Sequence, residues 1–136
     1  MALTKAQKAA KVSQAKDLVI SMTKSSTFAM LPPNETFDVS IKAGTTLESI
    51  ESSAITTESG VHKFIPVVCE DAKGKTHESS LYCGITEKTP DERKNWHIAL
   101  FEQFGDVISD LSFVGHTGDV RKNKAGYEVT YLSLEE

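Results

Sequence analysis

The side chains that could carry out chemistry are few and widely spaced in this chain of 136 residues. Four histidines and two cysteines are candidate metal ligands, but no pair has the C-x-x-C or H-x-x-x-H spacing of a zinc site. The segment Gly115-His116-Thr117-Gly118 lacks the spacing and the lysine of a phosphate-binding loop. No serine or cysteine lies in a sequence that resembles a nucleophile elbow. The sequence therefore predicts a protein that is not an enzyme, with no catalytic residue, metal or cofactor.

Basic and aromatic side chains favour binding instead. A single nucleic-acid strand is held by cations that neutralise phosphates and by aromatic rings on which bases stack. We predict that such a site is formed by Lys63, Tyr82, Arg121, Lys122, Lys124 and Tyr127. Two plainer interpretations stay open: the tyrosines could be half-buried strand residues, and the basic cluster could be a solvated hairpin loop.

Charge is distributed unevenly along the chain. Residues 1–24 contain five lysines and one aspartate, a net charge of +4, whereas the rest carries 10 basic and 18 acidic side chains, a net −8. A basic arm on an acidic body indicates a polyanion or an acidic surface as partner; the alternative is a solubilising, frayed terminus. The composition of residues 2–24 favours helix. Lys8 and Lys11 fall on its apolar face, so we expect its first turns not to pack.

From Thr36 onward the sequence predicts strands. Apolar and polar residues alternate over 36–42, the pattern of a half-buried strand. Residues 45–57 keep no strict alternation and predict a bulged strand. The strongest hairpin signal joins 61–70 to 76–85. The last two strands are expected over residues 107–114 and 127–134, with a polar loop at 115–126 between them.

The hairpin register bears on the two cysteines. A two-residue loop at positions 73–74 would place Cys69 opposite Glu78 and Cys83 opposite Phe64. The thiols would then lie beyond disulfide reach. We therefore predict two free, structural cysteines.

A helix between the strands completes the pattern. It begins at the capping box of residues 89–92 (TPDE) and ends at Gly105. After the N-terminal arm and one extra strand, the order is strand, strand, strand, helix, strand, strand. This is the order of an OB-fold, a five-stranded, partly open β-barrel with its helix between strands three and four. We predict a mostly β chain: a helix-prone arm over 1–27 and one OB-like barrel domain over 28–136.

The stretch over residues 63–75 (KFIPVVCEDAKGK), followed by a polar strand and a capped helix, resembles small OB-type proteins of phages and mobile elements. Many of those proteins bind single-stranded DNA. The resemblance covers residues 36–134 and implies a non-enzymatic, DNA-binding role.

Single-stranded nucleic-acid binding, with DNA as the expected ligand, is thus the leading hypothesis. The alternative is a structural or assembly subunit, such as a virion or complex component, whose N-terminal arm docks on a neighbour to give a homo-oligomer. A third possibility is a small regulatory protein that mimics nucleic acid. No apolar run approaches the ~20 residues of a membrane helix, and there is no signal-peptide core. The sequence therefore predicts an intracellular, cytoplasmic protein, which could be a viral protein in a host cell.

Overall fold

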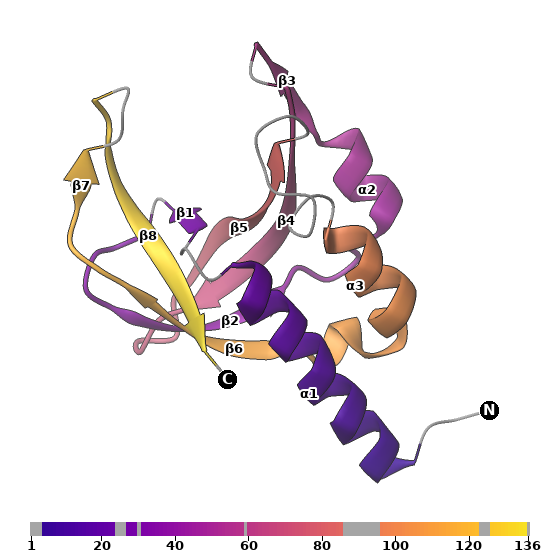
Figure 1. The fold of residues 1–136 in the computed structure, drawn as a ribbon. Coiled ribbons are helices and arrows are strands. Elements are labelled where there is room, and N and C mark those ends of the chain that lie inside the picture. The colour runs from indigo at the N-terminus through magenta and orange to yellow at the C-terminus, as the bar shows by residue number, and fades with distance from the viewer. Residues whose placement is uncertain are drawn as a thin grey trace.

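The structure, a computed structural model, describes residues 4–23, 27–29, 31–58, 60–85, 96–122 and 126–135; Figure 1 shows its elements. The helices are α1 (Lys5–Met22), α2 (Leu47–Ser52), α3 (Trp96–Phe104) and the 3-10 helix η2 (Gly105–Asp110). The strands are β1 (Thr27–Ala29), β2 (Thr36–Ile41), β3 (Ile55–Thr57), β4 (Gly60–Glu70), β5 (Thr76–Ile85), β6 (Ser112–Thr117), β7 (Arg121–Lys122) and β8 (Glu128–Glu135).

These strands form one antiparallel sheet of eight, with neighbours in the order β1-β8-β6-β2-β4-β3. In addition, β5 pairs with β4, and β7 pairs with β8. The long strand β4 pairs with β3 over its first residues and with β2 over its last, while β5 lies along its other edge. The run β6-β2-β4-β5 is a Greek key, because β6 returns after a helical connection to lie beside β2.

The prediction of a mostly β chain is confirmed, but the strands do not form the expected five-stranded, partly open barrel. The sheet is open, and within the described residues no ladder joins β5 to β8. The physical reason is β1: its three residues pair with Thr130–Leu132 of β8 and lie beside β5. The edge of β8 that would close a barrel is therefore already occupied.

The central hairpin has a register one residue away from the predicted one. Cys69 lies opposite His77, and Phe64 lies opposite Tyr82. The cause is a longer loop: the Asp71 amide donates to the Lys75 carbonyl at 2.9 Å, and Gly74 takes a left-handed φ of 82°. Both cysteines are buried and free, as predicted.

The N-terminal helix packs onto the body through its later turns, whereas residues 4–10 are exposed, as its sequence predicts. A capping box between Thr4 and Gln7 starts α1, and Ala15 and Val19 are fully buried. In these exposed first turns, Lys8 and Lys11 form surface ion pairs with Asp110 and Asp106 of η2, at 3.1 and 2.8 Å.

Three other segments differ from their predictions. Residues 45–57 are not one bulged strand but the short helix α2 followed by β3. The expected strand over 107–114 begins only at Ser112, because η2 precedes it, and the loop over 115–126 contains the end of β6 and β7. The predicted helix is described from Trp96 to Phe104, and its proposed cap at residues 89–92 lies outside the described residues.

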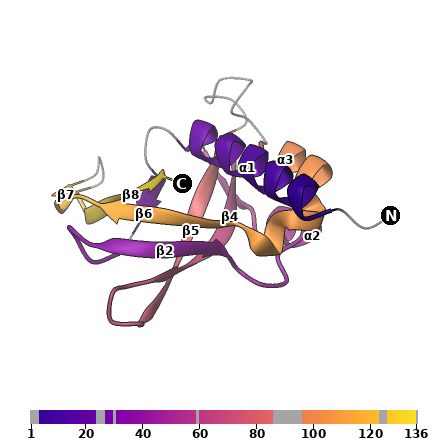
Figure 2. The ribbon, with the colours of Figure 1, turned by 90° about the horizontal axis from the view of Figure 1, so that it is seen from below.

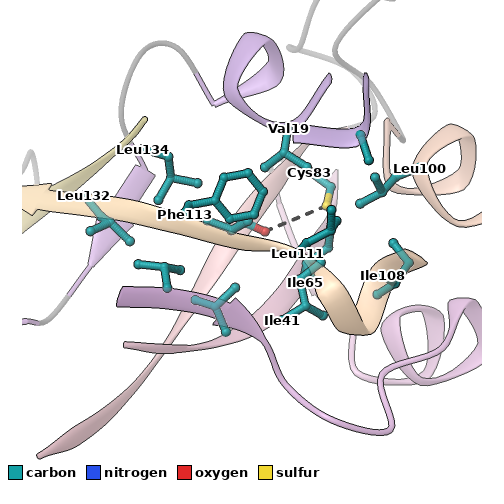
Figure 3. Close-up of a cluster of buried hydrophobic side chains, with 14 of the residues drawn as sticks. Val19, Ile41, Ile65, Cys83, Leu100, Ile108, Leu111, Phe113, Leu132 and Leu134 are labelled. Atoms are coloured by element: carbon teal, nitrogen blue, oxygen red, sulfur yellow. Dashed lines mark hydrogen bonds between the residues drawn. The ribbon is translucent and has the colours of Figure 1, made fainter. Parts of the chain in front are cut away.

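The core lies between the inner face of the curled sheet and helices α1 and α3. Figure 2 shows these two helices side by side over one side of the sheet. In Figure 3, Val19 from α1 lies close to Phe113 of β6, and Leu100 from α3 and Leu132 from β8 belong to the same buried cluster. Polar residues alternate with buried Phe37, Val39 and Ile41 along β2, which confirms the predicted half-buried strand. No described helix is long and apolar enough to cross a membrane.

Candidate nucleic-acid interface

Three rings cluster on the face of the β4–β5 hairpin that points away from the core. The Tyr82 ring lies 5.3 Å from that of Phe64 and 5.9 Å from that of His62, measured between centroids. The Tyr82 hydroxyl lies 3.1 Å from Nδ1 of His62. All three side chains are half-buried, so part of each ring is open to solvent. We call His62, Phe64 and Tyr82 the aromatic cluster.

Local structure explains why these rings gather. Phe64 and Tyr82 are directly opposite in the ladder, where cross-strand aromatic pairs pack well. The register shifts between His62 and Phe64, and a β-bulge of this kind re-aims side chains. On the inner side the Trp96 indole donates to the Tyr82 carbonyl at 3.3 Å. Burial, and to a lesser extent the neighbouring Cys83, raises the pKa of the Tyr82 hydroxyl.

A second contact connects the aromatic cluster to β3. The Thr57 hydroxyl lies 2.7 Å from Nε2 of His62. His62 therefore bridges two hydroxyl groups, one from β3 and one from β5. Residues 47–57, which we call the α2–β3 segment, therefore contact the aromatic cluster through Thr57.

Three of the predicted residues lie on the β7–β8 hairpin. Arg121 and Lys122 are exposed on β7, where they pair with Val129 and Glu128 of β8. Tyr127, just before β8, is 69% exposed. Lys124 lies outside the described residues. The β7–β8 hairpin thus carries two exposed cations, with an exposed ring just before β8.

Lys63 does not join this surface. Its ammonium lies 3.0 Å from a carboxylate oxygen of Glu51 on α2, and its side chain is only 16% exposed. Along β4 the side chains at every second position after Lys63, beginning with Ile65, are buried, so Lys63 lies on the inner face of the strand. The structure therefore does not bring Lys63 together with Tyr82, because the two side chains belong to opposite faces of the hairpin.

The lysines of α1 also lie elsewhere. Lys8 and Lys11 are paired with η2, and Figure 1 shows the start of α1 far from the tips of β3 and β7. They do not add to the positive charge beside the aromatic cluster.

Several titratable groups of the described residues are buried or held in structural contacts. Burial raises the pKa of Cys69 to about 11 and that of Cys83 to about 12, and thiols in such surroundings are poor nucleophiles. His77 contacts Asp71 at 3.1 Å, but the same carboxylate accepts the amides of Lys73 and Lys75 and so shapes the turn. Within the described residues no three His, Cys, Asp or Glu side chains are grouped to hold a metal.

Sequence reasoning missed His62 and Phe64. The two residues are two positions apart on a strand, which indicates that they share a face. Whether that face is also the face of Tyr82 depends on the register of the hairpin. No protein family, curated protein or solved structure was found to match the chain.

Proposed function

We propose that the protein binds single-stranded nucleic acid, with DNA as the expected ligand, across the outer face of the β4–β5 hairpin. The observation that carries this proposal is the aromatic cluster, a solvent-facing group of rings on a rigid, doubly paired strand. Unpaired bases can stack on such rings, each adding roughly 1–3 kcal/mol. Arg121 and Lys122 would neutralise phosphates, and Tyr127 would offer a further ring.

The arrangement of the strands supports an OB-like interpretation, although the sheet is open. OB-folds are Greek-key barrels that bind oligonucleotides on strands two and three and on the loops after strands one and four. In this chain the corresponding parts are the β4–β5 hairpin, the α2–β3 segment and the β7–β8 hairpin. Figure 1 shows β3 and the β7–β8 hairpin projecting to the same side, with β5 and β1 between them.

Few cations are available to this face. Arg121 and Lys122 are the described ones, and Lys124 follows them in sequence. Two or three phosphate contacts to a single strand give a slope of log affinity against log salt of about −1.4 to −2.1. Affinity should therefore fall roughly 7- to 20-fold between 50 and 200 mM salt. We expect binding that depends mainly on stacking, with moderate salt dependence.

The test is fluorescence anisotropy of a labelled oligo-dT at several salt concentrations, with duplex DNA of equal length as control. Tyr82→Leu should weaken binding roughly 5- to 150-fold, the equivalent of one stacked base. Tyr82→Phe, which keeps the ring and loses only the hydroxyl, is the matched control and should retain most of the affinity. Absence of binding at low salt, or equal binding to the duplex, would contradict the proposal.

One observation favours the alternative, an assembly subunit. The exposed large hydrophobic side chains of the described residues are Ile55, Val120 and Tyr127, and they lie on the same two projecting segments. Exposed apolar groups gathered on one side mark protein contact sites as well as ligand sites. Light scattering of Ile55→Ser and Val120→Ser variants distinguishes the two: a change from oligomer to monomer would support assembly through this side.

A further inference from the structure

Glu51, near the end of α2, joins three elements of the fold. Its carboxylate oxygens lie 3.0 and 3.1 Å from the ammonium of Lys63 on β4. One of them also lies 3.1 Å from Nε2 of His97 on α3. These hydrogen bonds, that from Lys63 foremost, hold the pKa of Glu51 below its ordinary value of 4.5. A single carboxylate thus connects a helix, a strand and a second helix.

Burial of the partners makes this carboxylate hard to replace. His97 is fully buried, and within the described part of the chain its Nδ1 has no hydrogen-bond partner. Among the described residues, the hydrogen bond of the His97 ring is therefore the one between its Nε2 and the Glu51 carboxylate. Without it a buried ring nitrogen would lose its acceptor, which costs more than an exposed ion pair contributes.

The segment that Glu51 holds leads to the aromatic cluster. Ile50, fully buried, anchors α2 beside Glu51. The chain then continues into β3, whose last residue, Thr57, contacts His62 at 2.7 Å. The α2–β3 segment is held to the body by Glu51 and Ile50 at one end and by Thr57 at the other.

We propose that Glu51 is a positioning residue of the nucleic-acid site: it clamps the α2–β3 segment to β4 and α3, so that Thr57 holds His62 beside Tyr82. This inference rests on the proposed function. Lys63 is then the structural partner of Glu51 and makes no phosphate contact. Loss of the clamp should lower affinity without changing the number of counterions released, and therefore without changing the salt slope.

The experiment has one arm without nucleic acid and one with it. The first is NMR-detected hydrogen exchange of the Ile50, Ser53 and Ala54 amides, which donate to Thr46, Ser49 and Glu51 carbonyls at 3.1 to 3.3 Å. The second is oligo-dT binding against salt. The variants are Glu51→Ala, Glu51→Gln, which keeps volume and one acceptor, and Lys63→Met, which keeps the aliphatic stem. Glu48→Gln, a change on the same helix at an exposed position, is the matched control.

In Glu51→Ala we expect exchange at the three amides to accelerate about tenfold, as expected for the loss of roughly one charge-assisted hydrogen bond. Glu51→Gln should give a smaller change in the same direction, and it decides the result if the alanine variant does not fold. Affinity should fall several-fold, while the salt slope stays within about 0.3 of the wild-type value. Glu48→Gln should match wild type in oligo-dT binding, and because it removes only a first-turn carboxylate of α2 it should accelerate exchange less than Glu51→Ala does.

Two results would overturn the inference. One is wild-type exchange at all three amides in both Glu51 variants. The other is a salt slope in Lys63→Met that is shallower by about 0.7, which would make Lys63 a phosphate contact. If wild type itself fails to bind oligo-dT, the proposed function fails, and the exchange arm still decides whether Glu51 clamps the segment.

Discussion

Gly115, in the middle of β6, is the position where one methyl group should matter most for the fold. Its strand lies between β2 and β8, and it pairs with Phe37 and Leu134. A Cβ atom at this position would lie 2.7 Å from Cγ2 of Val39 and 2.9 Å from Cδ1 of Leu132. Both neighbours are fully buried, so neither can move into solvent. The missing side chain lets two core residues pack over β6 where the sheet curls.

The expected cost of Gly115→Ala follows from this geometry. Both distances are well below ordinary van der Waals contact, and overpacking in a filled core costs about 1–3 kcal/mol. For a chain of this length each kcal/mol lowers the melting temperature by roughly 3–4 °C. We therefore expect Gly115→Ala to melt about 3–12 °C below wild type, by calorimetry or circular dichroism.

The control is Gly105→Ala, because an added Cβ there has no atom within 4 Å. It should melt within about 2 °C of wild type, or slightly higher. A double-mutant cycle with Val39→Ala sharpens the test: the alanine at position 39 makes room, so Gly115→Ala should cost less in that background. A Gly115→Ala variant as stable as Gly105→Ala would refute the packing argument.

Other predictions concern titration. Cys69 and Cys83 should not react with Ellman's reagent at pH 8 in the folded protein, because burial raises their pKa to about 11 and about 12, and both should react in denaturant; rapid native labelling would contradict their burial. Hydrogen bonds from His77 and Lys11 lower the pKa of Asp71 and of Asp106 below the ordinary 3.8. The folded state then binds fewer protons than the unfolded chain, so their contribution is present above about pH 4 and is lost as the pH falls through the lowered values. Urea midpoints should drop in that range for wild type and less for Asp106→Asn; an equal drop would contradict the role of the Lys11–Asp106 pair.

A segment of the fold could be predicted where its sequence pattern fits only one type of secondary structure. The alternation over 36–42 has one, because a strand with one buried face needs a period of two, and β2 has that burial pattern. The segment over 45–57 has two meanings. Leu47 and Ile50 are three residues apart, which suits a helical turn, and Thr46 caps it through Ser49 rather than through Glu or Gln. A helix of six residues is too short for periodicity to identify.

The hairpin register could not be predicted from strand composition alone. A shift of one residue exchanges the faces of every side chain on a strand. The Asp71 carboxylate decides the register by accepting the amides of Lys73 and Lys75, which favours the longer loop. With that loop Tyr82 moves to the face of Phe64, and the aromatic cluster forms. The sequence thus predicted other neighbours for the Tyr82 ring than Phe64 and His62, which lie beside it in the structure.

Lys63 shows the corresponding limit for charge. On sequence it is a cation on a strand beside aromatic residues, and nothing local distinguishes a phosphate contact from a structural ion pair. Its partner Glu51 lies in a segment that was expected to be a strand, and His97 lies on a helix far along the chain. Only the tertiary packing of α2 against both β4 and α3 brings the three together.

The two parts of the proposed site, the aromatic cluster and the cations of β7, differ in how extensively their strands are paired. We expect them to have different roles for this reason. The aromatic cluster stands on β4, which is paired on both edges and tied through Thr57 and His62 to a clamped segment. Arg121 and Lys122 stand on a two-residue strand that pairs only with β8 within the described residues. Rigid rings lose little entropy on stacking and should determine the lifetime of the complex. Exposed cations act over a distance and should mainly determine the association rate and its salt dependence.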